Sequence, residues 1–277
     1  MTSMRVERTG PRTTVQDLGR PGYGHVGVPL AGAADRGALR RANRLVGNME
    51  SAAALETTFG GLVVRIASAG EVTITCVGST LVVEDAEHEG PARVSDGAIV
   101  RVGTPERGVY SYLAVAGGIE VPPVLGSRST DTLSGLGPAV VRPGDELPVG
   151  QPAQAPQTID AVASTDDPLR VVLGPRDDWF TESAIRQLLD SEWTVQPDSD
   201  RIGVRLGGSV LERRVTRELP SEGMIAGAIQ VPPGGQPIVF VANHPTTGGY
   251  PVIAVILTGD VDRASQMRPG AQLRFRL

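Results

Sequence analysis

Lysine is absent from this chain: all 26 of its basic residues are arginines. Walker-type phosphate binding, attachment of biotin and Schiff-base catalysis each depend on a lysine side chain. Hydrolases that use a Ser-Ser-Lys triad are excluded for the same reason. The chain therefore carries no biotin of its own, and any nucleotide that it binds must be held in a non-Walker manner.

Cysteine and histidine are scarce. The single cysteine, Cys76, permits no internal disulfide, and its place in an apolar run favours a small buried residue over a nucleophile. The three histidines, His25, His88 and His244, lack the spacing of metal ligands, so no metal site is predicted. His88 lies among acidic residues, which predicts a solvated turn. A G-x-S-x-G nucleophile elbow is also missing.

Long apolar runs are missing as well. No segment approaches the roughly 18 apolar residues that a membrane span requires, and the first residues lack the apolar core of a signal peptide. We therefore expect a cytoplasmic chain with no membrane partner. The net charge of −5, without an arginine-rich face, argues against nucleic acid as the main partner.

The residues that are abundant predict a mainly β protein. With 35 glycines and 22 prolines, turns should be frequent and long helices few. Short apolar runs separated by Gly or Pro are typical of barrels and sandwiches. Strands are expected at residues 62–66, 81–83, 98–102, 109–116, 169–173, 252–257 and 272–277.

Two helices are predicted. Residues 33–47 repeat apolar side chains at helical spacing and end on Gly47, a common helix stop. The second should begin near Thr181, whose hydroxyl can cap free N–H groups, and end near Asp190.

The segment 151–167 lacks a sustained apolar period and is expected to be a linker. It divides the chain into an N-terminal β subdomain, residues 1–150, and a C-terminal β subdomain, residues 168–277. Each subdomain ends on a similar phrase, in which a Pro-Gly turn precedes a closing strand. The two phrases, 141–147 and 267–275, are weak evidence for duplication, but they fit a chain of two barrel-like subdomains.

Residues 221–251 are dense in features of a binding site. Strands are expected at 228–231 and 237–242, with Gly234-Gly235 as the hairpin turn between them. The next residues, Asn-His-Pro-Thr-Thr-Gly-Gly-Tyr-Pro at 243–251, cannot continue the strand, because two prolines remove ladder donors. We call residues 243–251 the signature loop. By composition it is equally well a binding loop or a surface turn.

Four further motifs occur in order with this loop. They are Thr-Val-Gln-Asp-Leu-Gly-Arg-Pro-Gly-Tyr-Gly at 14–24, residues 48–61 with Leu-Glu-Thr at 55–57, residues 112–119 leading to Gly-Ser-Arg-Ser-Thr-Asp at 126–131, and residues 200–206. In these motifs the chain resembles the family of allophanate hydrolase subunit 2, also described as the C subunit of 5-oxoprolinase. The same module resembles the carboxyltransferase region of urea carboxylase. At 243–245 this chain has Asn-His-Pro where many members carry Asp-Arg-Gln, which predicts a different substrate if those side chains touch it.

The resemblance implies two cyclophilin-like barrel subdomains, similar to carboxyltransferase subdomains A and B. It also implies a non-autonomous subunit of an ATP-dependent 5-oxoprolinase, which converts 5-oxo-L-proline to L-glutamate. The partner would be the companion family, allophanate hydrolase subunit 1 or the B subunit of 5-oxoprolinase, and ATP would be shared with the partner subunits. Two alternatives stay open. One is carboxyl transfer to a urea-like substrate from carboxybiotin on another chain; the other is a regulatory subunit that relieves its partner's inhibition of a histidine kinase.

Three residues are candidates for catalysis: Glu222, His244 and Tyr250. Glu222 would serve as a general base if burial raised its pKa, or it would cap a turn. Residues 22–27 spell G-x-G-x-x-G, but no helix start follows, so a ligand loop or a packed turn is expected there rather than a dinucleotide site.

Further residues are candidates for substrate binding. The guanidinium of Arg128, among three hydroxyl residues, suits a carboxylate or phosphate oxygen, although an Arg128–Asp131 turn is an alternative. Asp200, Arg201 and Arg205 could form an internal ion network. The full set of predicted binding residues is Arg20, Tyr23, His25, Arg128, Thr246, Thr247, Gly248 and Gly249.

Overall fold

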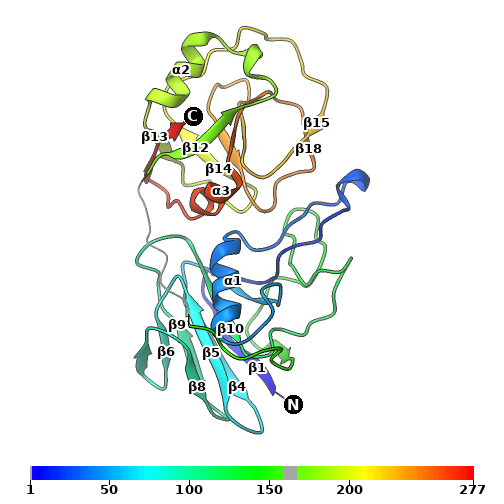
Figure 1. Cartoon of the computed structure of the whole chain (residues 1–277), viewed down its shortest axis with the longest axis vertical. Helices are drawn as coiled ribbons and strands as arrows, with labels where there is room; N and C mark the ends of the chain where they lie inside the picture. The colour runs from blue at the N-terminus through cyan, green and yellow to red at the C-terminus, as the bar shows by residue number, and fades with distance from the viewer. Residues whose placement is uncertain (1, 159–166) are drawn as a thin grey trace. The chain divides into compact units, whose positions relative to one another are not determined.

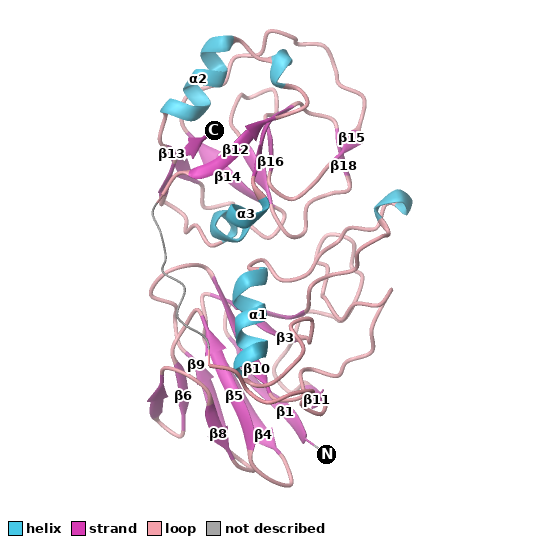
Figure 2. Cartoon of the chain, viewed as in Figure 1, coloured by secondary structure: helices cyan, strands magenta, loops and turns pink. Residues whose placement is uncertain are grey.

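The computed structural model describes residues 2–158 and 167–277 (Figure 1). The chain forms two compact units: Met1–Pro21 with Ala31–Val162, and Gly22–Leu30 with Ala163–Leu277. Strands predominate in both, and the described residues contain three short α-helices (Figure 2). The mainly β prediction is confirmed. The division at a 151–167 linker stays a prediction, because residues 159–166 lie outside the described residues.

The first unit contains a six-stranded antiparallel sheet. Its strands are β1 (Thr2–Thr9), β4 (Leu62–Ala67), β6 (Leu81–Val83), β7 (Ala86–His88), β9 (Ile99–Val102) and β11 (Glu146–Val149). They lie in the order β11-β1-β4-β9-β6-β7. In β1 the side chains alternate: Met4 and Val6 are buried, whereas Arg5 and Glu7 are exposed. This period of two is the pattern of a strand with one face on a core.

A second antiparallel sheet completes the core of this unit. Its strands are β2 (Arg12–Gln16), β3 (Ala54–Thr58), β5 (Val72–Val77), β8 (Ala92–Val94) and β10 (Tyr110–Val115). The order is β2-β3-β10-β5-β8. Both faces of β10 are buried: Leu113 belongs to the core between the two sheets, and Tyr112 belongs to a second cluster with Leu39. Two sheets around one core thus build this unit.

Helix α1 (Arg36–Leu45) supplies that second cluster and packs on β10 and β5. It is shorter than the predicted span, because Asp35 has an extended backbone and acts as the N-cap, accepting a hydrogen bond from the amide of Ala38 at 2.8 Å. Gly47 has a left-handed backbone, with φ of +75°, as the predicted helix stop requires.

The second unit is a nearly closed barrel. Its main strands are β12 (Leu169–Leu173), β13 (Trp193–Val195), β14 (Gly203–Gly207), β16 (Ala228–Gln230), β17 (Ile238–Phe240), β19 (Val252–Ile256), β20 (Gln272–Leu273) and β21 (Phe275–Arg276). The order is β20-β13-β14-β17-β16-β19-β12-β21. Because β20 and β21 flank a single residue, Arg274, the C-terminal segment joins the two ends of the sheet. Gln272–Leu273 thus pairs with β13 at one end of the sheet, and Phe275–Arg276 pairs with β12 at the other.

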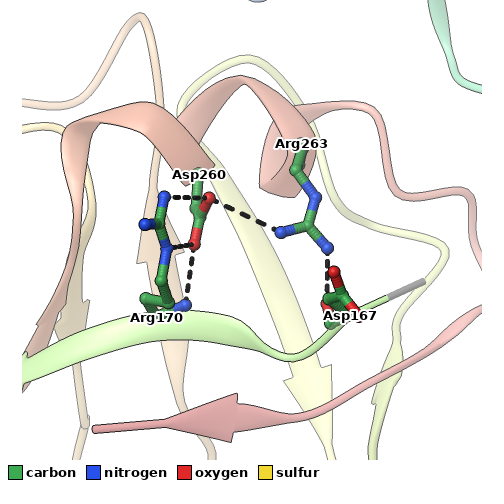
Figure 3. A network of polar contacts seen from close by, with 4 residues as sticks. All are labelled: Asp167, Arg170, Asp260 and Arg263. Carbon is green, nitrogen blue, oxygen red and sulfur yellow. Dashed lines mark hydrogen bonds and ion pairs between the residues drawn. The ribbon is translucent and has the colours of Figure 1, made fainter. Parts of the chain in front are cut away.

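Two helices pack on the barrel. The predicted helix α2 (Glu182–Asp190) is confirmed, with the Thr181 hydroxyl accepting from the amide of Ala184 at 3.1 Å. Helix α3 (Thr258–Ser265) was not predicted. Figure 3 shows what holds it: the buried Asp260 carboxylate accepts from Nε and Nη2 of Arg170, at 2.9 and 3.0 Å, and pairs with Arg263.

Cys76 and His88, which were considered as chemical groups in the sequence, both lie in strands. Cys76 lies in β5 and packs against the core, where burial raises the pKa of its thiol to about 12, so the structural interpretation is supported. His88 ends strand β7, which pairs with β6, so the predicted solvated turn is wrong at this residue. The turn lies just before, at Glu84 and Asp85, both with positive φ.

Candidate functional site

The signature loop follows a β-hairpin in the second unit, as predicted. Strands β16 and β17 are paired, and the amide of Gly235 donates to the carbonyl of Pro232 across the turn, at 2.9 Å. Beyond β17 the chain leaves the barrel, and Thr247–Gly248 (β18) pairs with Glu222–Gly223 (β15) in a short antiparallel ribbon. This ribbon brings the candidate Glu222 beside the candidates of the loop.

The carboxylate of Glu222 is paired with the guanidinium of Arg176. Its carboxylate accepts from Nε of Arg176, 2.9 Å from Oε1 and 3.1 Å from Oε2, and from Nη2 of the same guanidinium. These hydrogen bonds hold the pKa of Glu222 below its ordinary value. The expectation of a raised pKa, on which its role as a general base depended, is therefore wrong. The pair instead ties β15 to the turn before the short 3-10 helix η2 (Asp177–Trp179).

The two glycines of the loop differ in their packing. A Cβ at Gly248 would lie 2.6 Å from Nε2 of Gln230 and 3.2 Å from Cγ of Met224. A Cβ at Gly249 would meet nothing closer than the Leu219 carbonyl oxygen, at 3.6 Å. Neither glycine is among those with positive φ. Gly248 is needed because its neighbours are close.

Tyr250 is 44% exposed and is held from two sides. Its carbonyl accepts from Nε2 of the buried Gln230 at 3.0 Å, and the guanidinium of Arg213 lies over its ring, 6.0 Å from the centroid. In the described part of the chain, the hydroxyls of Thr246, Thr247 and Tyr250 have no hydrogen-bond partner. The loop therefore presents polar groups to its surroundings.

His244 and Asn243 lie inside the fold. Nδ1 of His244 donates to the carbonyl of Pro245 at 2.8 Å, because a carbonyl can only accept. Asn243 is fully buried, and its amide oxygen accepts from Nη2 of Arg201 at 3.1 Å. Asn243 and His244 therefore have contacts within the fold.

The predicted ion network of Asp200, Arg201 and Arg205 consists of separate contacts. Asp200 accepts from the amides of Ile202 and Gly203 and shapes a turn, while Arg205 pairs with the exposed Asp198 at 3.2 Å. These contacts support a local structural role for Asp200 and for Arg205.

In the first unit, an acceptor that was not predicted, Asp17, joins the segments that contain Arg20 and Arg128. Its carboxylate accepts from the hydroxyls of Ser127 and Ser129, from the amide of Gly19 and, at 2.6 Å, from the amide of Arg128. We call this group the Asp17 hub. It fastens the 14–24 motif to the 126–131 motif.

The two arginines of the hub are held internally. Arg20 is 1% exposed and donates through Nη2 to the carbonyl of Ser129. Arg128 donates through Nε to the carbonyl of Val121 and pairs with Glu120, with Nη2 and Oε2 at 2.7 Å. Its ion-pair partner is thus Glu120, not the Asp131 of the predicted turn.

Tyr23 and His25 lie in Gly22–Leu30, which groups with the second unit. The G-x-G-x-x-G stretch contains the one-turn 3-10 helix η1 (Gly24–Val26), and His25 is exposed on it. No strand leads directly into it and no α-helix begins there, consistent with the expectation that it is not a dinucleotide site.

Sequence reasoning missed three residues around the signature loop: Arg176, Arg213 and Gln230. Arg176 lies 46 positions from Glu222 along the chain, so no local pattern connects them. Gln230 was predicted only as a strand residue; a buried amide in an apolar strand was the available signal.

A model of the family described as "Carboxyltransferase domain, subdomain A and B" matches residues 26–277. The chain belongs to this carboxyltransferase domain family. Two relatives, from Escherichia coli K12 and Haemophilus influenzae, are each named as the C subunit of 5-oxoprolinase. They are 38% and 34% identical, over 98% and 95% of this chain and 90% and 87% of theirs. The resemblance inferred from the motifs is confirmed.

The fold of this carboxyltransferase-domain chain is also similar to solved structures. The K. lactis urea amidolyase aligns with a TM-score of 0.88 and 30% identity over 99% of this chain. The chain spans 18% of that enzyme and 56% of another matching solved chain. It therefore corresponds to one part of larger proteins as well as to separate subunits.

Among residues 2–158 and 167–277, no group of three or more His, Cys, Asp or Glu side chains could hold a metal ion. In the same residues, no helix combines the length and the apolar character needed to cross a membrane.

Proposed function

We propose that this chain is the C subunit of an ATP-dependent 5-oxoprolinase and forms part of a site that a B-type partner completes. The observation that carries the proposal is the 38% identity to the C subunit of 5-oxoprolinase from E. coli, over nearly the full length of both chains. The reaction would open the lactam ring of 5-oxo-L-proline to give L-glutamate, with ATP shared among the subunits. We expect the assembly to act in the cytoplasm, where ATP is available.

The geometry supports a non-autonomous subunit. Glu222 is bound to Arg176, and Arg128 is bound to Glu120, so these two predicted groups are already paired. His244 and the hydroxyls of the signature loop are polar groups that can orient a substrate, but they do not form a nucleophile–base pair among themselves in the contacts described. A partner that supplies the remaining groups is consistent with this arrangement.

The test is reconstitution. The chain is co-expressed with its B-type and third-subunit homologues, and ATP hydrolysis is measured with and without 5-oxo-L-proline. We expect 5-oxoproline-dependent ATP hydrolysis and glutamate formation only when this chain is present. Turnover by the chain alone, or full turnover by the other subunits without it, would contradict the proposal.

Carboxyl transfer is the second candidate, and the family description together with the urea amidolyase structure favours it. Because the chain has no lysine, carboxybiotin would have to come from another protein. Supplying a carboxylated biotin carrier and a urea-like acceptor to the same assembly separates the two reactions. If neither reaction occurs, the regulatory alternative is tested by assaying a histidine kinase with the B-type partner in the presence and absence of this chain.

A further inference from the structure

Arg213 is fixed beside the signature loop by the backbone around it. The amide of Leu211 donates to the carbonyl of Gly235, the amide of Thr181 donates to the carbonyl of Glu212, and Arg213 itself forms a bridge with Phe180. Its position relative to the barrel is thus set by main-chain hydrogen bonds on each side. The backbone from which the Arg213 side chain extends is therefore held in place beside the barrel.

The guanidinium of Arg213 is only partly used. Nη2 donates to the carbonyl of Val231, and the group lies over the ring of Tyr250. Nε is buried and has no hydrogen-bond partner among the described residues. A buried donor without a partner is costly, so an acceptor supplied by a ligand beside Nε would stabilise this arrangement.

The charge of Arg213 is also uncompensated. Elsewhere in the unit, Arg170 pairs with Asp260 and Arg176 pairs with Glu222, whereas the described residues offer Arg213 no carboxylate within ion-pair distance. Burial lowers the pKa of Arg213 from its ordinary value, and the Tyr250 phenol opposes this only in part. An anion at this position would satisfy both the charge and the donor.

The position of Arg213 connects it to the loop. Its ring partner, Tyr250, is the residue after Gly248-Gly249, and Tyr250 is anchored through its carbonyl by Gln230. An anion bound by Arg213 would therefore lie beside Tyr250 and within the region of the signature loop. We propose that Arg213, stacked on Tyr250, is the carboxylate-binding residue of this site. On the function proposed above, the ligand group that Arg213 recognises is the carboxylate of 5-oxo-L-proline.

The direct test is the Nε–H resonance of Arg213 in the complete chain labelled with nitrogen-15. The resonance is identified by its loss in Arg213→Met. The chain is titrated with 5-oxo-L-proline and, as the matched neutral ligand, with pyrrolidin-2-one, which has the lactam ring but no carboxylate. We expect a saturable shift of this resonance with the acid and none with the neutral lactam.

Variants give the second measurement, the affinity of the reconstituted assembly for 5-oxo-L-proline. Arg213→Lys keeps the charge but loses the planar fork, so the affinity should fall about tenfold or more. Arg214→Met is the matched control, because Arg214 lies next in sequence and binds the carbonyl of Asp178 instead. Its affinity should equal that of the unaltered assembly. Thermal unfolding of each variant checks that the fold is retained.

Several results would overturn the inference. They are an Arg213 resonance that 5-oxo-L-proline does not move, an equal shift with pyrrolidin-2-one, or unchanged affinity in Arg213→Lys. A shift with bicarbonate or inorganic phosphate but not with 5-oxo-L-proline would also reject a lactam carboxylate as the ligand. Failure of the unaltered assembly to turn over 5-oxo-L-proline would contradict the proposed function instead, and the resonance test separates the two.

Discussion

The Asp17 hub of the first unit and the signature loop region of the second are built from the same kinds of residue, but they use them differently. In the hub, Asp17 binds two hydroxyls and two amides, and Arg128 is bound to Glu120. Around the signature loop, the hydroxyls of Thr247 and Tyr250 and one donor of Arg213 are unused by the described residues. Nη1 of Arg20 in the hub is also buried without a hydrogen-bond partner among the described residues, so the two regions differ mainly in the loop hydroxyls that remain available.

The largest expected effect is in the hub. Asp17→Ala removes a buried acceptor and leaves several buried donors without partners, so the free energy of unfolding should fall by about 3–5 kcal/mol. Urea denaturation measures this. The control is Asp198→Ala, which removes an exposed carboxylate paired with Arg205 and should cost less than about 1 kcal/mol. Equal losses in the two variants would mean that the hub is not a structural centre.

Substitutions of the two glycines of the signature loop should differ in how far they lower the free energy of unfolding, measured by the same urea denaturation. Gly248→Ala places a methyl group against Gln230 and Met224 and should cost about 1–3 kcal/mol. Gly249→Ala has room for the methyl group and should change stability by no more than about 0.5 kcal/mol. If Gly249 were the more sensitive position, the packing described for the loop would be wrong.

The Asp260 network predicts a pH dependence in the second unit. Hydrogen bonds from Arg170 lower the pKa of Asp260 from 3.8 to about 2. Because the folded pKa lies below the unfolded one, the network stabilises the fold above about pH 4, and this stabilisation is lost as the pH falls towards 2. Thermal unfolding should show a smaller loss over that range in Asp260→Asn than in the unaltered chain. Parallel curves would contradict the assignment.

The effect on stability expected at Arg128 is small compared with that at Asp17. Because this side chain is half-exposed and tied to Glu120 and to the Val121 carbonyl, Arg128→Met should lower the free energy of unfolding by about 1 kcal/mol. Glu120→Gln should produce a similar or smaller loss. A variant that unfolds normally but no longer supports turnover would show that Arg128 contacts substrate after all.

The sequence predicted elements best where the local pattern decides the structure. The strands at 81–83 and 169–173 were placed with their observed bounds, and Thr181 was identified as a cap. Helix α3 was missed because Thr258-Gly259 is a poor helix start, and the helix is held by the distant Arg170. Tertiary contact overrides local propensity there.

The site was harder to predict for the same reason. The motifs located the signature loop, but the partner of Glu222, the packing of Gly248 and the position of Arg213 depend on residues far apart in the chain. Arg128 shows the limit: its guanidinium is visible in the sequence, whereas only the fold shows that the carboxylate of Glu120 pairs with it. Its predicted role in binding an anion stays a prediction.

The central claim is that the second unit, through Arg213 and the signature loop, contacts the substrate while the arginines of the hub maintain the fold. The most direct measurement is the KM for 5-oxo-L-proline of the reconstituted assembly containing Arg213→Met or Arg128→Met, with the thermal midpoint of each. The account predicts that Arg213→Met raises the KM about tenfold or more, whereas Arg128→Met leaves the KM unchanged and lowers only the midpoint. A raised KM in Arg128→Met together with an unchanged KM in Arg213→Met would contradict it.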